Sequence, residues 1–289
     1  MAEPLVIVGK GMAATRLVEE LGQRALGRHA IAVIGEEPRL AYNRVLLSLL
    51  LAGEITESEI ELKPAAWWQA RGVSTFYGRS VTAIDRAAKT VTLVDGATLP
   101  YGQLVLATGS KPVRPHLPGI DLPGMMTFRD MADVRTLREA AHHGARIVVI
   151  GGGLLGIEAA YGLSRSGARV TLLHLVDRLM ERQLDAEGAA LLAEAVALRG
   201  IDLKLGAATR AFIGRDHVEA VELQDGTVLP ADIVVIAIGV RPNTALAETA
   251  GLSIDRGILV DDAMTTSDPA IFAIGECAQH DGSVYGLVE

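Results

Sequence analysis

Two glycine-rich turns carry the residues whose types and spacing most clearly predict chemistry. They occupy the three positions of a GxGxxG fingerprint: Gly9, Gly11 and Ala14 in the first, and Gly151, Gly153 and Gly156 in the second. The first position permits a tight turn and the second lets the backbone approach a pyrophosphate. The third, where alanine is accepted, lets a helix pack close to a strand. One such turn is weak evidence, but two in one chain predict two dinucleotide-binding sites.

Each turn lies in the context that a dinucleotide site needs. Short apolar runs at residues 5–8 and 147–150 precede the turns and are typical of buried strands. A helix-like segment follows each turn, and further apolar runs at 31–34 and 170–173 predict the next strands. The N-terminus of such a helix offers free N–H groups and the positive end of its dipole to phosphates.

The remaining chain predicts the fold class. Two antiparallel excursions with Asp-Gly turns, at 95–96 and 225–226, interrupt the strand–helix pattern. A stiff segment with prolines 112, 115 and 118 indicates a crossing between domains. We therefore predict an α/β protein with two Rossmann-like dinucleotide-binding domains of three-layer (ββα-type) architecture, the second inserted in the first. The first domain is expected at 1–113 and 242–289, with its last strands returning to the first sheet, and the second at 114–241.

Composition excludes several functions. The 27 Lys and Arg residues against 35 Asp and Glu give a net charge of −8, which argues against nucleic acid and anionic membranes as partners. No apolar run has transmembrane length and no signal peptide is recognisable, so a cytoplasmic protein is expected. The single cysteine, Cys277, excludes an intrachain disulfide, and the seven histidines show no metal-ligand spacing.

Polar residues beside the turns extend the predicted sites. Glu36 and Glu37 lie about 20 residues past the first glycines, where an acid binds ribose hydroxyls. His174 occupies the corresponding place in the second copy; it favours neither NAD nor NADP, and Asp177 or Arg178 could decide. Arg44 is either a bidentate clamp on cofactor phosphates or a surface arginine before a core helix.

Two strand ends add further candidates. Residues 104–109 form an apolar strand that ends in Ala107, Thr108 and Gly109, which would allow close approach of a flat cofactor. Residues 233–238 repeat this pattern before Gly239. Glu276 is expected to end the last strand at the carboxyl edge, either as a solvated acid or as a hydrogen-bond acceptor for a ribityl chain.

Taken together, these elements resemble the pyridine nucleotide–disulfide reductase superfamily of flavoproteins. The segments AYNRVLLS at 41–48, DRLMERQLD at 177–185 and GECA at 275–278 are most similar to the flavoprotein portion of assimilatory NAD(P)H nitrite reductases and to nitrate reductase electron-transfer components. Reductases for rubredoxin and dioxygenase ferredoxins are close relatives. Many of these carry a lysine after the leucine-serine of the first segment, and Leu49 stands there instead.

The resemblance implies an oxidoreductase that binds FAD in the first domain and NAD(P)H in the second, with a slight preference for NADH. Hydride would pass to FAD, and electrons would continue to a metal-centred partner, an iron–sulfur/sirohaem centre of nitrite or nitrate reductase. A homodimer is possible. No side chain is assigned as a catalytic acid or base. The residues expected to contact FAD are Gly9, Gly11, Met12, Ala13, Ala14, Glu36, Glu37, Arg44, Val81, Ala107, Thr108, Gly109, Gly275 and Glu276. Those expected to contact NAD(P)H are Gly151, Gly153, Leu155, Gly156, Glu158 (near the nicotinamide), His174 and Gly239.

Three alternatives remain open from the sequence. A rubredoxin- or ferredoxin-type reductase would use the same hydride step with another acceptor. Cys277 could form a sulfenic acid, although its place beside Glu276 favours a packing role. Family members continue past this point with an interface domain, which we expect to be missing here, so the chain could also be a silent nucleotide-binding fragment.

Overall fold

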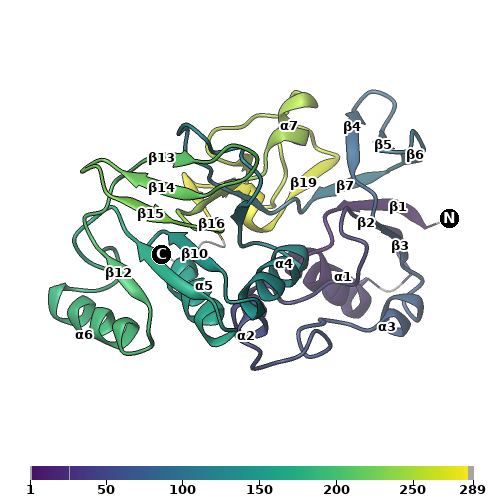
Figure 1. The fold of residues 1–289 in the computed structure, drawn as a ribbon. Coiled ribbons are helices and arrows are strands. Elements are labelled where there is room, and N and C mark those ends of the chain that lie inside the picture. The colour runs from purple at the N-terminus through teal and green to yellow at the C-terminus, as the bar shows by residue number, and fades with distance from the viewer. Residues whose placement is uncertain (1, 26, 286–289) are drawn as a thin grey trace. The chain divides into compact units, whose positions relative to one another are not determined.

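The computed structural model describes residues 2–25 and 27–285, which form two compact units. The first unit contains the chain up to Asn43, Glu61–Lys111 and the described residues from Arg241 on; the second contains Arg44–Ile60 and Pro112–Val240. Each is built around a five-stranded sheet (Figure 1). In the described part of the chain, no helix has both the length and the apolar character needed to cross a membrane.

The first unit is mainly strand, with one long helix. Its elements, including the two strands at the passages between units, are β1 (Glu3–Val8), α1 (Met12–Arg24), β2 (His29–Gly35), α3 (Ala65–Gln69), β3 (Ser74–Tyr77), β4 (Val81–Asp85), β5 (Thr90–Leu93), β6 (Thr98–Pro100), β7 (Gln103–Leu106), β8 (Ser110–Pro112), β17 (Val240–Pro242), α7 (Ala245–Thr249), β18 (Ile258–Val260), β19 (Ile271–Ala273), the 3-10 helix η2 (Gly275–Cys277), β20 (Ala278–His280) and β21 (Ser283–Val284).

Side chains alternate across the first sheet and separate three layers. The sheet has the order β19-β7-β1-β2-β3, with every pairing parallel. Leu5 and Ile7 of β1 pack against α1, where Ala14 and Val18 are buried. Val6 and Val8 point the other way and share a core with β5, in the antiparallel sheet β4-β5-β6. Such alternation is what a strand buried on both faces requires.

The second unit repeats this plan with more helix. Its elements are the 3-10 helix η1 (Arg44–Leu46), α2 (Leu47–Leu51), β9 (Met125–Thr127), α4 (Met131–His142), β10 (Arg146–Ile150), α5 (Leu154–Arg165), β11 (Arg169–Leu173), α6 (Ala186–Ala197), β12 (Asp202–Lys204), β13 (Thr209–Ile213), β14 (Ala220–Leu223), β15 (Val228–Pro230) and β16 (Ile233–Ile236).

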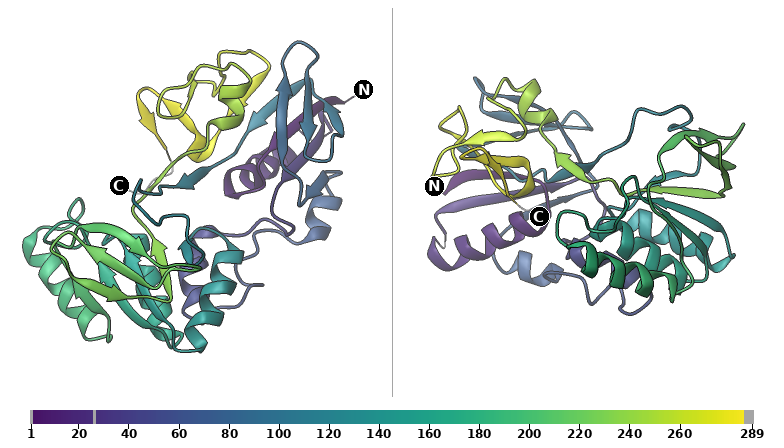
Figure 2. Two further views of the ribbon diagram at one scale, coloured as in Figure 1. Left: turned by 45° about the horizontal axis from the view of Figure 1, so that its top comes forward. Right: turned by 90° about the vertical axis from the view of Figure 1, so that its left-hand side faces the viewer.

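Three layers also build this unit. Its parallel sheet has the order β12-β11-β10-β16-β9. The antiparallel strands β13–β15 share a core with it that includes Val148, Phe212 and Val221. Helices α2, α4 and α5 pack against one another, and α5 also packs on β10 and β11 (Figures 1 and 2). The predicted α/β architecture with two parallel sheets and two antiparallel excursions is present.

The predictions for the C-terminal segment were partly wrong. Of the described strands after residue 242, β19 alone joins the first sheet, because β18 pairs with β20 in a separate three-stranded sheet with β21. Glu276 does not end a strand: β19 stops at Ala273, and Glu276 lies in η2. The positive φ of Gly275, 74°, turns the backbone away from the extended course of β19 at this point.

Candidate dinucleotide-binding sites

The first position of each fingerprint requires glycine. Gly9 has φ of +111°, and a Cβ there would lie 2.0 Å from the carbonyl oxygen of Ala107. Gly151 has φ of +127°, and its Cβ would lie 2.1 Å from the carbonyl oxygen of Ala237. Both the conformation and the backbone contact exclude a side chain. The same local construction therefore occurs in both units.

Each turn lies at the reversal point of its sheet. Strand β1 lies between β2 and β7, and β10 lies between β11 and β16, so later strands extend each sheet in both directions. The Ala107 N–H donates to the Val8 carbonyl at 2.7 Å, and the Ala237 N–H donates to the Ile150 carbonyl at 2.8 Å. In open α/β sheets, ligands bind at the carboxyl ends of strands at this point.

The second fingerprint position, Gly11 or Gly153, shows whether the pyrophosphate of a dinucleotide fits beside each turn. Gly11 and Gly153 are the N-cap residues of α1 and α5, and neither helix has a side-chain cap. Their φ values, −99° and −80°, are open to any residue. Apart from its chain neighbours, a Cβ on either glycine would meet no atom of the described residues within 4 Å. Glycine here leaves a backbone cradle at a helix N-terminus, and a pyrophosphate fits such a cradle.

The third position differs between the two copies. A Cβ on Gly156 would lie 1.9 Å from the carbonyl oxygen of Gly151, so only glycine fits there. In the first copy Ala14 is fully buried and packs in the core of the first unit. The close contact between helix and turn is therefore tighter in the second unit.

Acidic residues after β2 lie beside a lysine that the sequence analysis did not single out. The Tyr42 hydroxyl donates to the Glu37 carboxylate at 2.8 Å, while Glu36 is exposed. Lys10, inside the fingerprint, donates to the Glu37 carbonyl at 3.4 Å and lies 3.7 Å from the Tyr77 ring centroid. Burial lowers the pKa of Lys10 to about 8, against the opposing attraction of Glu37. The position of Lys10 between Gly9 and Gly11 could have indicated this cluster from the sequence.

The candidates around β7 and η2 come together at one end of the first sheet. The Thr108 hydroxyl donates to the Asn243 carbonyl at 2.7 Å, and the Ser110 hydroxyl donates to the Glu276 carboxylate at 2.7 Å. A Cβ on Gly275 would lie 3.0 Å from that of Ala13 in α1. The turn after β19 therefore lies close to the N-terminus of α1.

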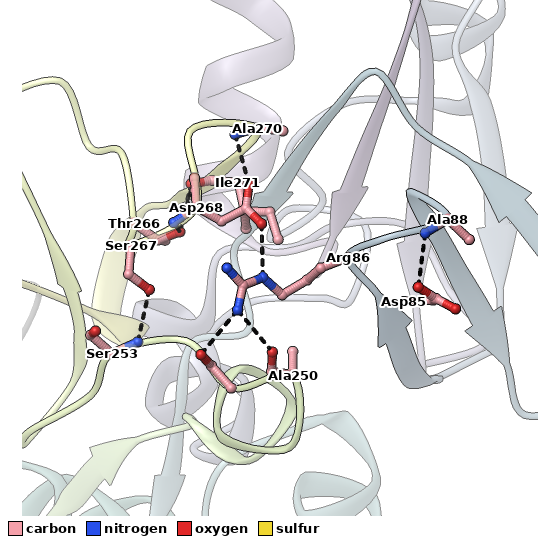
Figure 3. A network of polar contacts seen from close by, with 11 residues as sticks. Asp85, Arg86, Ala88, Ala250, Ser253, Thr266, Ser267, Asp268, Ala270 and Ile271 are labelled. Carbon is pink, nitrogen blue, oxygen red and sulfur yellow. Dashed lines mark hydrogen bonds and ion pairs between the residues drawn. The ribbon is translucent and has the colours of Figure 1, made fainter.

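A polar network anchors the segment that leads into β19 (Figure 3). Arg86, just after β4, donates through Nε to the Asp268 carboxylate at 2.7 Å and through Nη1 to the Gly251 carbonyl at 3.1 Å. The hydrogen bond from Arg86 is the main cause that lowers the pKa of Asp268. The pair joins residues 182 positions apart and fixes the antiparallel layer to the strand that precedes Gly275.

In the second unit, His174 directly follows β11 and contacts the fingerprint turn. The Gly152 N–H donates to His174 Nδ1 at 3.0 Å, and His174 Nε2 lies 3.0 Å from the Glu181 carboxylate. The His174 side chain is 11% exposed and that of Glu181 37% exposed. Glu181 was not predicted from the sequence, because its place in an irregular segment gives no periodic signal.

The other candidates are more dispersed. Leu155 and Glu158 lie in the first turns of α5 and are half-buried. Gly239 has φ of +111° and accepts a hydrogen bond from the Val113 N–H at 2.9 Å. Val81 begins β4 and packs on the core of the first unit. Arg44 belongs to the second unit, where its guanidinium donates to the Arg129 carbonyl at 2.9 Å. The cofactor contacts of all these residues stay predictions.

Comparison with known proteins identifies the family to which a chain with these two turns belongs. The model of the pyridine nucleotide-disulphide oxidoreductase family matches residues 3–287. Over 98% of the chain, the sequence is 42% identical to a nitrite reductase [NAD(P)H] and 41% identical to an assimilatory nitrate reductase electron transfer subunit, both of Bacillus subtilis. The chain spans only 35% and 37% of the lengths of these two relatives.

A solved structure of a related protein has the same fold. The crystal structure of a ferredoxin reductase from Rhodopseudomonas palustris aligns with a TM-score of 0.89 and 31% identity, over 96% of this chain and 69% of that one. The predicted Rossmann-type fold, enzyme class and pairing of FAD with NAD(P)H are confirmed at the level of the family. The chain belongs to the pyridine nucleotide-disulphide oxidoreductase family.

Proposed function

We propose that the chain transfers a hydride from NAD(P)H to FAD, with FAD in the first unit and the nicotinamide nucleotide in the second. The observation that carries this proposal is the repeated cradle at Gly11 and Gly153, where a Cβ would lie more than 4 Å from every described residue other than its chain neighbours. The family supplies the identity of the two nucleotides. We assign FAD to the first unit because the first fingerprint and the segment around Glu276 resemble the FAD-binding portion of the family.

The residues of the chain bind and orient the two nucleotides. Glu37 would hold the adenosine ribose of FAD, and Glu276 would accept a hydrogen bond from the ribityl chain. Flavin supplies the chemistry, because it accepts two electrons together and can release them singly. A hydride step of this kind depends on stacking and orientation.

We propose that the electrons continue to an iron–sulfur/sirohaem centre of nitrite or nitrate reductase. The similarity to the two Bacillus subtilis proteins favours this acceptor. A ferredoxin-type acceptor is the second candidate, and the Rhodopseudomonas palustris structure favours it. We also propose that the protein is cytoplasmic and forms a homodimer.

Anaerobic steady-state oxidation of NADH by the FAD-loaded chain tests these proposals. Ferricyanide serves as a small acceptor that needs no docking surface, and a ferredoxin, a rubredoxin and the metal-containing portion of a nitrite reductase are compared with it. The proposal expects turnover with ferricyanide and the greatest acceleration by the nitrite reductase portion. Acceleration by ferredoxin alone would favour the second candidate. No FAD-dependent turnover with ferricyanide would favour the silent fragment.

A further inference from the structure

The second unit lacks an acid where the adenosine ribose of a dinucleotide is normally recognised. In this fold a carboxylate about 20 residues past the glycines binds the ribose hydroxyls of NAD, and a nearby arginine accommodates the 2′-phosphate of NADP. Here the residue after β11 is His174, and the next two residues, Leu175 and Val176, are exposed and apolar. The three residues that directly follow β11 therefore carry neither an acid nor an arginine.

The hydrogen bonds of His174 determine which of its nitrogens carries the proton. Because Nδ1 accepts the Gly152 N–H at 3.0 Å, it holds a lone pair, and the ring proton lies on Nε2. Nε2 then donates to the Glu181 carboxylate at 3.0 Å. The ring also lies directly against the turn, since a Cβ on Gly152 would be 2.5 Å from His174 Cγ. His174 thus connects the fingerprint backbone to a carboxylate from seven residues later.

A second set of contacts holds the segment with Glu181 in place. The Met180 N–H donates to the Gly152 carbonyl at 3.0 Å, and Met180 adopts a φ of 50°, which is rare for a residue with a side chain. Leu179 is fully buried, and its Cδ2 would lie 2.7 Å from a Cβ on Gly152. The two residues directly before Glu181 are therefore fixed to the fingerprint turn.

Glu181 itself is suited to bind a polar ligand. Partial burial is the largest single influence on the Glu181 carboxyl, and it raises the pKa. Hydrogen bonds from its own backbone and from His174 outweigh burial, and the pKa of this carboxyl lies below its usual range. The side chain is 37% exposed, so a charged carboxylate is accessible beside the turn.

The geometry points to Glu181, positioned by His174, as the acid that binds the adenosine ribose of NADH and disfavours the 2′-phosphate of NADPH. This inference rests on the proposed function of the second unit. A carboxylate accepts hydrogen bonds from a ribose diol and repels a phosphate. Arg178 and Arg182 lie in the same segment, with Arg178 donating to the Glu181 carbonyl at 3.4 Å. They would remain to attract a 2′-phosphate once the carboxylate charge is removed.

The test is equilibrium binding of NADH and NADPH to the full chain, followed by nucleotide fluorescence, for wild type and Glu181→Gln. The amide still accepts the proton of His174 Nε2, so the loop keeps its anchor. We expect the Kd for NADH to rise about fivefold to tenfold, as charge-assisted hydrogen bonds become neutral ones. The Kd for NADPH should fall, because the repulsion is lost. Glu194→Gln, at an exposed position of α6, removes the same charge and should leave both constants unchanged.

A second variant separates the role of the carboxylate from that of the loop. Adding His174→Glu to Glu181→Gln places an acid directly after β11, and the preference for NADH should return. Unchanged preference in Glu181→Gln, or a wild-type chain that prefers NADPH, would overturn the inference and leave the proposed function standing. A wild-type chain that binds neither nucleotide would overturn the proposed function and this inference with it.

Discussion

The cradle at the second fingerprint position makes a prediction that separates folding from binding. Gly153→Ala places a methyl group more than 4 Å from every described residue except its chain neighbours, at a backbone conformation that alanine adopts freely. The loss of glycine at an N-cap costs roughly 0.5–1 kcal/mol of stability. At about 2–4 °C per kcal/mol, the Tm should fall by no more than about 4 °C.

Binding should respond much more strongly than folding. The added methyl would hold a pyrophosphate away from the N–H groups of α5, and each charge-assisted hydrogen bond contributes about 1.5–3 kcal/mol. Loss of one such bond corresponds to a rise of roughly tenfold to a hundredfold in the Kd for NADH. Fluorescence titration with NADH and thermal denaturation of the same samples measure the two effects separately.

Gly11→Ala is the matched control in the first unit. The same substitution at the same N-cap position should reduce FAD retention, read from visible absorbance, and should leave the Kd for NADH near the wild-type value. A folded Gly153→Ala variant that binds NADH as tightly as wild type would refute the assignment of the cradle. Loss of NADH affinity in Gly11→Ala alone would refute the assignment of the two nucleotides to the two units.

The remaining predictions concern polar groups of the first unit. Arg86→Met should lower the free energy of unfolding by about 1–2 kcal/mol in urea denaturation, because it leaves the 16% exposed Asp268 without its charged partner. Arg79→Met, which breaks an exposed pair with Asp95, should cost less than about 1 kcal/mol, and equal costs would contradict this view of the network. The Arg86–Asp268 contribution should be fully present above pH 3.8, the ordinary pKa of the acid, and should disappear as pH falls through its lowered folded-state pKa. Because the folded-state pKa of Lys10 is about 8 and its ordinary value is 10.5, the unfolded chain binds more protons between these pH values. Wild type should therefore gain stability relative to Lys10→Met as pH rises across this window, and parallel pH profiles would contradict the lowered pKa.

The sequence predicted the parts of the fold that depend on local pattern. The two turns could be identified because each glycine position has a distinct steric cause, which Gly9 and Gly151 show through their contacts with neighbouring strand ends. The two antiparallel excursions followed from Asp-Gly turns, and in both the aspartate accepts the backbone N–H two residues later, that of Ala97 or Thr227.

Features that depend on contacts between residues far apart in the sequence could not be predicted from the sequence. The apolar run of α2 indicated a helix but not its neighbours, and Arg44–Ile60 packs with the second unit. Strand β18 has the composition of a sheet strand, yet its partner is β20 and not the first sheet. Glu181 contacts His174 and directly follows Met180, whose φ is positive, and no periodicity of the sequence encodes such a turn.

The proposed hydride transfer requires that one chain holds FAD and accepts a hydride from a nicotinamide nucleotide. Its most direct test is the visible absorbance spectrum of the purified chain reconstituted with FAD, recorded anaerobically during titration with NADH and, separately, NADPH. We expect a yellow protein that is bleached by both nucleotides, with NADH effective at the lower concentration. A chain that stays colourless after reconstitution, or a yellow chain that neither nucleotide bleaches, would contradict it.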